Sequence, residues 1–158
     1  MTKIISLYQR FIKGIPSIQF LPLLASRLAL AYGFYGTAKT KWSDIHAVAE
    51  WFGSMGIPAP LLNAYLAAGS EALGVVLLTL GLGTRFIVIP LIIVMIVAIK
   101  TVHWANGFDA GNNGFEIPLY YAIMLLTLFV FGSGKISLDY LIERKQKVKQ
   151  SNTKALFE

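Results

Sequence analysis

Two charged residues lie inside apolar stretches of this sequence, and they are its most informative candidates for a functional site. Arg27 falls within the first apolar stretch and Glu71 within the second. An isolated charge at the centre of a membrane helix costs roughly 2.5–3.5 kcal/mol, so each residue needs a partner or a function. In antiparallel neighbouring helices their depths would differ by only ~6 Å, which puts a salt bridge within reach. The pair either satisfies itself or forms a proton- or ligand-binding site.

A second set of polar and aromatic residues is expected where the apolar stretches end. These candidates for ligand binding are Lys39, His103, Trp104, Asp109 and Glu116. We expect the four ionisable ones to converge at the outer mouth of the bundle, above the layer of Arg27 and Glu71. Aromatic walls for a ligand are predicted from Trp104 and three tyrosines, namely Tyr32, Tyr35 and Tyr121.

His103 and Glu116 each have more than one interpretation. His103 could carry a proton, donate to a quinone carbonyl or bind a metal, or it could be an interfacial residue beside Trp104. Glu116 could be an acid of the ligand site, or it could form a capping box with Asn113. Two histidines on one side of a membrane are compatible with copper or haem, but their spacing matches no metal motif, so no metal site is predicted.

The elements that must position these residues are membrane helices. Hydrophobic residues make up 56% of the 158, against about 45–50% in ordinary soluble domains, and the mean hydropathy is +0.63. Four spans are predicted, at about residues 20–38, 61–82, 85–103 and 115–132. The third is apolar all round, which excludes a soluble bundle with charged outer faces. The predicted fold is therefore an all-α transmembrane four-helix bundle.

Two further helices are predicted to lie at the membrane surface. Apolar residues recur at helical spacing in residues 4–15 and again in residues 45–55, where Ser43 or Asp44 could cap the helix. Residues 1–142 form a single membrane domain, followed by a basic tail, residues 143–158, that we expect to be loose beyond about Arg144.

The charges predict the orientation in the membrane. Basic residues gather on the flanks that share a side with the N-terminus, and few lie on the opposite side. The positive-inside rule then puts both termini in the cytoplasm. The net charge of +6 is a signal of topology and of contact with anionic lipid, and it does not indicate a nucleic-acid partner. The chain has no cysteine, so it cannot itself carry out disulfide exchange.

Short motifs between these elements together resemble the DoxX family. They are Gly36-Thr-Ala-Lys39, Gly56-Ile-Pro58, Glu71, Gly81-Leu-Gly-Thr-Arg85, Gly111-Asn-Asn-Gly114-Phe-Glu116 and Gly132-Ser-Gly134-Lys-Ile-Ser137-Leu-Asp139. The resemblance covers about residues 21–142 and implies a four-helix protein of the bacterial inner membrane. Family members have been linked to sulfur-compound oxidation that feeds electrons to quinone, to oxidoreductase complexes that cope with thiol stress, and to operons that mature copper-binding peptides.

Three functions follow as hypotheses. The first is a membrane subunit that serves a redox or stress-related protein partner, with a quinone or similar amphiphile held by Arg27, Glu71 and His103. No intrinsic cofactor is predicted, so electrons would come from elsewhere. The second is a non-catalytic scaffold or maturation component. The third is a small transporter, which would need more than four spans or a homo-oligomer.

Overall fold

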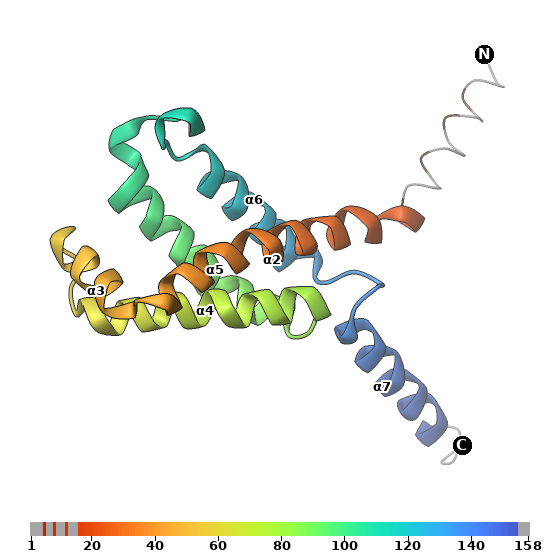
Figure 1. Cartoon of the computed structure of the whole chain (residues 1–158). Helices are drawn as coiled ribbons and strands as arrows, with labels where there is room; N and C mark the ends of the chain where they lie inside the picture. The colour runs from red at the N-terminus through yellow and green to blue at the C-terminus, as the bar shows by residue number, and fades with distance from the viewer. Residues whose placement is uncertain (1–4, 6–7, 9–11, 13–15, 155–158) are drawn as a thin grey trace.

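The computed structural model describes residues 5, 8, 12 and 16–154, and this part of the chain is helical, without strands. The longer helices carry the labels of Figure 1. They are α2 (Phe20–Ser43), α3 (Ile45–Ser54), α4 (Pro60–Leu80), α5 (Thr84–Ala98), α6 (Glu116–Phe131) and α7 (Leu138–Lys154). Between α5 and α6 lie a π-helix, Ile99–His103, and two short 3₁₀ helices, Trp104–Asn106 and Ala110–Asn112.

Three of the helical segments are long and apolar enough to cross a membrane, namely Pro16–Ser43, Pro60–Leu80 and Thr84–Asn106. They coincide with the first three predicted spans. The fourth apolar helix, α6, has 16 residues and extends about 24 Å, which is less than the ~30 Å of a hydrocarbon core. By length alone, therefore, three of the four predicted spans qualify.

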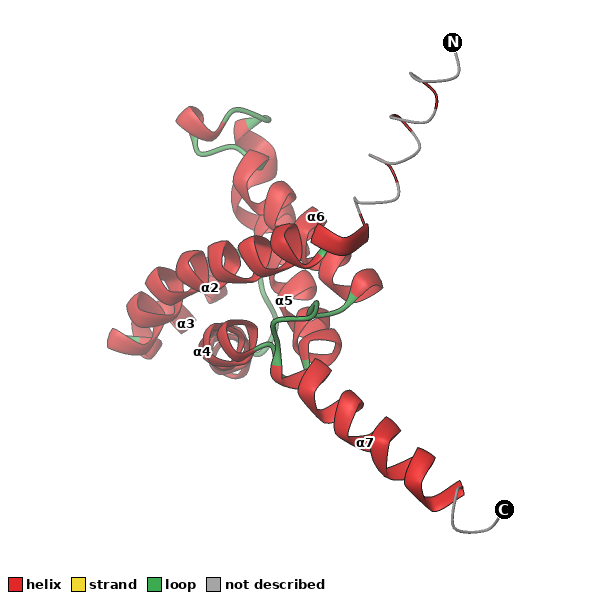
Figure 2. Ribbon diagram, turned by 90° about the vertical axis from the view of Figure 1, so that its right-hand side faces the viewer, coloured by secondary structure: helices red, strands yellow, loops and turns green. Residues whose placement is uncertain are grey.

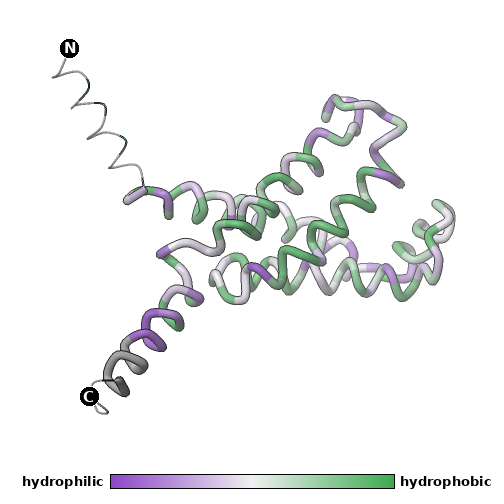
Figure 3. Tube along the Cα trace, turned by 180° about the vertical axis from the view of Figure 1, so that it is seen from behind, coloured by the Kyte–Doolittle hydropathy of each residue, from purple (hydrophilic) through white to green (hydrophobic). Residues whose placement is uncertain are grey.

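The four apolar helices form two antiparallel pairs that diverge from a common end. Helices α2 and α4 lie side by side, with α3 folded against the outer end of α4, and α5 and α6 form the second pair (Figures 1 and 3). The pairs meet close to the α4–α5 turn and separate away from it. Around their contact, the buried core contains Leu30, Phe34, Leu78, Leu91 and Leu125.

Close packing between the pairs depends on a small residue in α4. A Cβ atom built on Gly74 would lie 2.9 Å from Cδ1 of Leu91 in α5. Such a contact is shorter than van der Waals packing allows, so glycine lets the two helices approach at this level.

The predicted surface helix after the first span has the expected local start. The carboxylate of Asp44 accepts a hydrogen bond from the Ala47 amide at 2.9 Å and so caps α3. Ala49 and Phe52 of α3 are buried against Ala64 of α4. The other predicted surface helix, residues 4–15, lies outside the described residues except for positions 5, 8 and 12.

The basic tail continues as helix α7 to Lys154, a helix that was not predicted from the sequence. It projects away from the bundle (Figures 1 and 2). Between Leu138 and Lys154 there is neither glycine nor proline, and Lys, Arg, Gln and Glu are good helix formers. These propensities explain why a strongly charged segment extends the helix.

Candidate functional site

The buried carboxylate of Glu71 pairs with Lys41. Lys41 Nζ lies 2.9 Å from Oε1 and 2.8 Å from Oε2 of Glu71. The two side chains are 17% and 2% exposed, respectively. The salt bridge to Arg27 that the sequence made plausible is therefore wrong: the carboxylate of Glu71 has a different cation as its partner.

Arg27 instead binds backbone carbonyl groups at the end of the bundle where the two helix pairs meet. Its guanidinium donates to four oxygens: Leu78 O at 2.7 Å, Thr79 O at 2.9 Å, and Ser133 O and Ile136 O at 2.8 Å each. The last carbonyls of a helix have no intrahelical partner and carry the negative end of the helix dipole. Arg27 therefore joins the end of α4 to the loop after α6.

The depth of Glu71 explains why it does not reach Arg27. It precedes Leu78 by one heptad, or about 10 Å along α4. Arg27 and Lys41 are fourteen positions apart in α2, close to four helical turns, so both lie on the face that packs on α4. This face places Arg27 beside Leu78 and Lys41 beside Glu71. The fourteen-residue spacing is the signal in the sequence that identifies Lys41.

Arg27 also requires a glycine where α4 ends. Gly81 has a φ of 65°, and a Cβ atom at this position would lie 2.5 Å from Cζ of Arg27. Glycine adopts this backbone conformation without strain and leaves room for the guanidinium. The Gly81 turn of the sequence motif therefore has a direct structural role.

A cavity of about 880 Å³ lies between the two helix pairs, and the Lys41–Glu71 ion pair forms part of its wall. Its lining comes from α2, α3, α4, α5, α6 and the π-helix, and it is mainly apolar. Representative apolar residues are Phe34, Phe52, Met55, Ile93 and Val97. A mostly apolar cavity with a few polar groups is the usual form of a small-molecule site.

His103 also lines this cavity, from the π-helix that ends the third membrane segment. Its Nδ1 lies 2.8 Å from the carbonyl oxygen of Asn113. Because a carbonyl oxygen can only accept a hydrogen bond, Nδ1 carries the hydrogen, and Nε2 of the neutral ring is an acceptor. π-helical turns inside longer helices are frequent at functional sites.

Tyr121 is the predicted aromatic residue that does line the cavity. Its ring packs edge-on against Phe34, with centroids 5.6 Å apart. A Cβ atom on Gly33 would overlap the Tyr121 hydroxyl group, so glycine is what admits this ring beside α2. The other three predicted aromatic residues, Tyr32, Tyr35 and Trp104, are outside the lining and exposed.

The predicted convergence of four ionisable residues is wrong, since only His103 among them lines the cavity. Lys39 is exposed on α2. Asp109 accepts hydrogen bonds within its own loop, from the Gly111 amide at 3.0 Å and from Asn112 Nδ2 at 3.1 Å. The loop before α6 thus closes on itself and uses its polar groups locally.

Glu116 belongs to the same closed loop. Its Oε2 accepts from the Ala110 amide at 3.1 Å, and its Oε1 accepts from the Tyr120 hydroxyl at 3.1 Å. The predicted capping box does not form, because Asn113 has a φ of 58° and Phe115 precedes the first residue of α6. Trp104 stacks on Phe115 with centroids 5.3 Å apart.

Apolar helices of this length, with buried charges satisfied inside the bundle, define a multi-pass membrane protein. The family model of DoxX matches residues 22–104, and the chain belongs to the DoxX family, as its motifs predicted. An uncharacterized protein of Haemophilus influenzae is 36% identical over 126 residues, which cover 77% of this chain and 83% of the relative. A Bacillus subtilis protein named "Putative oxidoreductase CatD" is 31% identical over 114 residues, covering 72% and 81%, respectively. No solved structure gives a significant match.

Proposed function

We propose that this protein binds a quinone or a similar amphiphile in the cavity between its helix pairs and serves a redox partner in the bacterial inner membrane. The observation that carries the proposal is the position of the Lys41–Glu71 ion pair, in the wall of a mainly apolar cavity of about 880 Å³. Buried charges inside membrane proteins mark ligand and ion sites more often than chance.

The polar groups of the cavity match the two redox forms of a quinone. The Lys41 ammonium group has three hydrogens, two of which suffice for the carboxylate of Glu71, and the Tyr121 hydroxyl is also a donor. Both suit a quinone carbonyl. His103 Nε2 is an acceptor and suits the hydroxyl group of a quinol. Of the seven residues that the sequence proposed, we assign His103 to the ligand directly and Glu71 to it through Lys41.

The redox association rests on the relatives and on the composition. One relative carries oxidoreductase in its name, and this chain has no cysteine for thiol chemistry of its own. We therefore assign electron transfer to a protein partner, with the present chain holding the amphiphile. A scaffold that only docks this partner is the alternative, and ligand binding separates the two.

Tryptophan fluorescence tests ligand binding directly, because Trp51 is the one of three tryptophans that lines the cavity. In a Trp42→Phe, Trp104→Phe background, a short-chain ubiquinone or menaquinone analogue should quench Trp51 saturably. His103→Ala should weaken this binding about tenfold, since it removes one hydrogen bond to the ligand.

The matched control is His46→Ala, because His46 is exposed and does not line the cavity. It should leave the affinity unchanged. Equal effects of the two histidine substitutions would remove His103 from the site. Quenching that never saturates would leave the scaffold function, which a stoichiometric partner copurified without quinone would then support.

The proposal includes four membrane crossings with both termini in the cytoplasm. Arg27 binds carbonyls at the end of α4 and, through Ser133 and Ile136, in the loop after α6, so α6 returns the chain to the level where α4 ends. A 16-residue helix can span by local thinning of the bilayer at a modest cost. We further propose that α3 lies at the outer membrane surface.

Reporter fusions test this orientation. Green fluorescent protein fused after Glu158 should fluoresce, and alkaline phosphatase at the same point should be inactive, because basic flanks stay in the cytoplasm. Alkaline phosphatase inserted after Asn112 should be active. An active phosphatase after Glu158 would contradict the proposed topology.

A further inference from the structure

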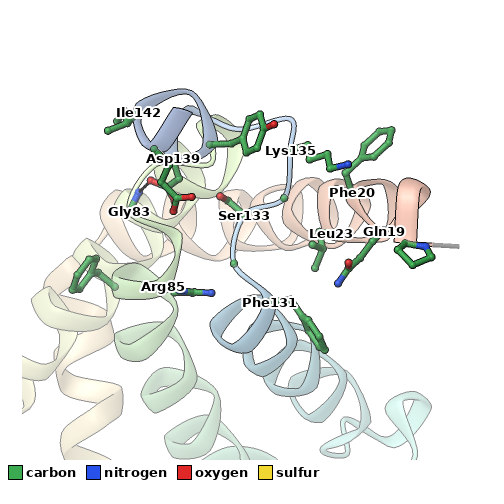
Figure 4. A pocket seen from close by; sticks show the side chains of 16 residues that line it. Gln19, Phe20, Leu23, Gly83, Arg85, Phe131, Ser133, Lys135, Asp139 and Ile142 are labelled. Atoms are coloured by element: carbon green, nitrogen blue, oxygen red, sulfur yellow. Dashed lines mark hydrogen bonds between the residues drawn. The ribbon is translucent and has the colours of Figure 1, made fainter. Parts of the chain in front are cut away.

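A second cavity, of about 550 Å³, lies at the opposite end of the bundle from the outer loops. It is formed where α2 and α5 begin, where α6 ends and where α7 begins (Figure 4). Nothing in the proposed function uses this cavity. Its position at the ends of membrane helices puts it at the level of lipid headgroups.

Two cations line this cavity, Arg85 and Lys135. In Figure 4 the Arg85 side chain points into the space between α5 and the end of α6. Arg85 Nη2 donates to Val130 O at 3.2 Å, and this bond uses one of the five guanidinium hydrogens. The guanidinium therefore keeps donors for a ligand.

The loop after α6 lies in contact with the Arg85 guanidinium. Gly132 has a φ of 78°, and a Cβ atom there would lie 3.5 Å from Nη2 of Arg85. The backbone turns at this glycine without strain and passes directly beside the guanidinium. Lys135 follows three residues later on the same loop, so the loop brings both cations to one cavity.

Two acidic residues, Asp139 and Glu143, also line this cavity. The Asp139 carboxylate is already bound at the start of α5, where it accepts from the Gly83 amide at 2.7 Å and from the Thr84 amide at 3.2 Å. Its charge therefore stabilises the positive end of a helix dipole. The second acidic residue, Glu143, is exposed on α7.

Apolar groups adjoin the cations. The lining includes Leu23 together with Phe20, Phe86 and Phe131, and the last two are 81% and 58% exposed, respectively. A free inorganic phosphate would make no use of exposed phenylalanines, whereas an acyl chain below a phosphate group would cover them. Basic pockets between membrane helices on the cytoplasmic side commonly bind anionic headgroups.

We propose that this inner cavity, defined by Arg85, Lys135 and the adjoining phenylalanines, binds one anionic phospholipid. The Arg85 guanidinium binds the phosphate group, Lys135 adds a positive charge from the loop after α6, and the acyl chains run along Phe86 and Phe131. The guanidinium supplies directional hydrogen bonds to the phosphate oxygens, and the ammonium group adds a point charge.

Native mass spectrometry of the full chain in detergent tests the proposal. Dioleoyl-phosphatidylglycerol should bind with a resolved first site, and dioleoyl-phosphatidylcholine should bind more weakly because it has no net charge. Arg85→Gln and Lys135→Gln should each weaken the first phosphatidylglycerol site about fivefold. Lys135 is exposed, so its substitution keeps the test valid even if the Arg85 variant folds poorly.

Lys100→Gln is the matched control, because Lys100 is exposed at the far end of the same membrane segment and outside this cavity. It should leave the affinity unchanged. Equal binding of the two lipids, or equal affinities in all three variants, would overturn the proposal. Displacement of the lipid by millimolar inorganic phosphate would also overturn it, since the site would then recognise the free anion.

Discussion

Substitution of Arg27 by methionine is expected to lower the free energy of unfolding by about 3–5 kcal/mol, the largest effect of any single change in this chain. The side chain is 1% exposed, and four backbone carbonyls lose their donor at once. Methionine fills a similar volume, so the loss reports the hydrogen bonds more than a cavity. Equilibrium unfolding in mixed micelles measures the change.

Two further variants test whether the loss of stability comes from the hydrogen bonds of Arg27. Arg27→Lys should recover only part of the stability, because an ammonium group is a compact point charge and cannot reach four separated carbonyls. Arg85→Met should change stability by less than about 0.5 kcal/mol, since Arg85 is exposed and makes one long hydrogen bond. A loss in Arg27→Met no larger than that in Arg85→Met would contradict the structural role.

The all-helical fold and three membrane-length helices were predictable from the sequence, because hydropathy and helix length are nearly one-dimensional properties. Apolar runs give the membrane helices, and the Asp44 cap gives the start of α3. α7 shows where this reasoning is incomplete. Charge predicted a tail outside the membrane domain, and its helical conformation is explained by the absence of helix-breaking residues between Leu138 and Lys154.

The candidate site was predictable only in part, because partner choice depends on rotation and depth as well as on charge. Arg27 and Glu71 were identified as important, yet each has another partner. Every residue has a backbone carbonyl group, so no pattern of residue types could predict that Arg27 binds carbonyl groups. Lys41 could have been found, since it repeats the helical face of Arg27 after fourteen residues.

The loop before α6 shows a different reason why a site cannot be predicted from sequence. Asp109 and Glu116 have the residue types of a binding site, but short loops satisfy their own amides with nearby carboxylates. Whether a carboxylate binds a nearby amide or a ligand depends on the local backbone geometry, which the sequence does not reveal. His103 also bonds to this loop through Nδ1 and the Asn113 carbonyl, yet it lines the cavity from the π-helix that ends the third membrane segment.

The second large effect is expected at the Lys41–Glu71 ion pair, in the cavity between the two helix pairs. Lys41→Met should lower the free energy of unfolding by about 3 kcal/mol, because Glu71 is then a buried charge without a cation. Glu71→Gln should cost a similar amount. The double variant should recover about 2 kcal/mol relative to the sum, since neither charge remains buried alone. Thermal and denaturant unfolding in the same detergent give this coupling energy.

Two further double-mutant cycles separate this pair from the others that the sequence allows. Arg27→Met with Glu71→Gln should be additive within about 0.5 kcal/mol, because the two side chains have no common partner. Lys39→Met with Glu71→Gln should also be additive, since Lys39 is exposed on α2. If Arg27 couples to Glu71 and Lys41 does not, the ion pair described here is wrong. If the Lys41–Glu71 double variant is stable and still binds the quinone analogue with full affinity, the pair serves only the fold, and the ligand is held by other groups of the cavity.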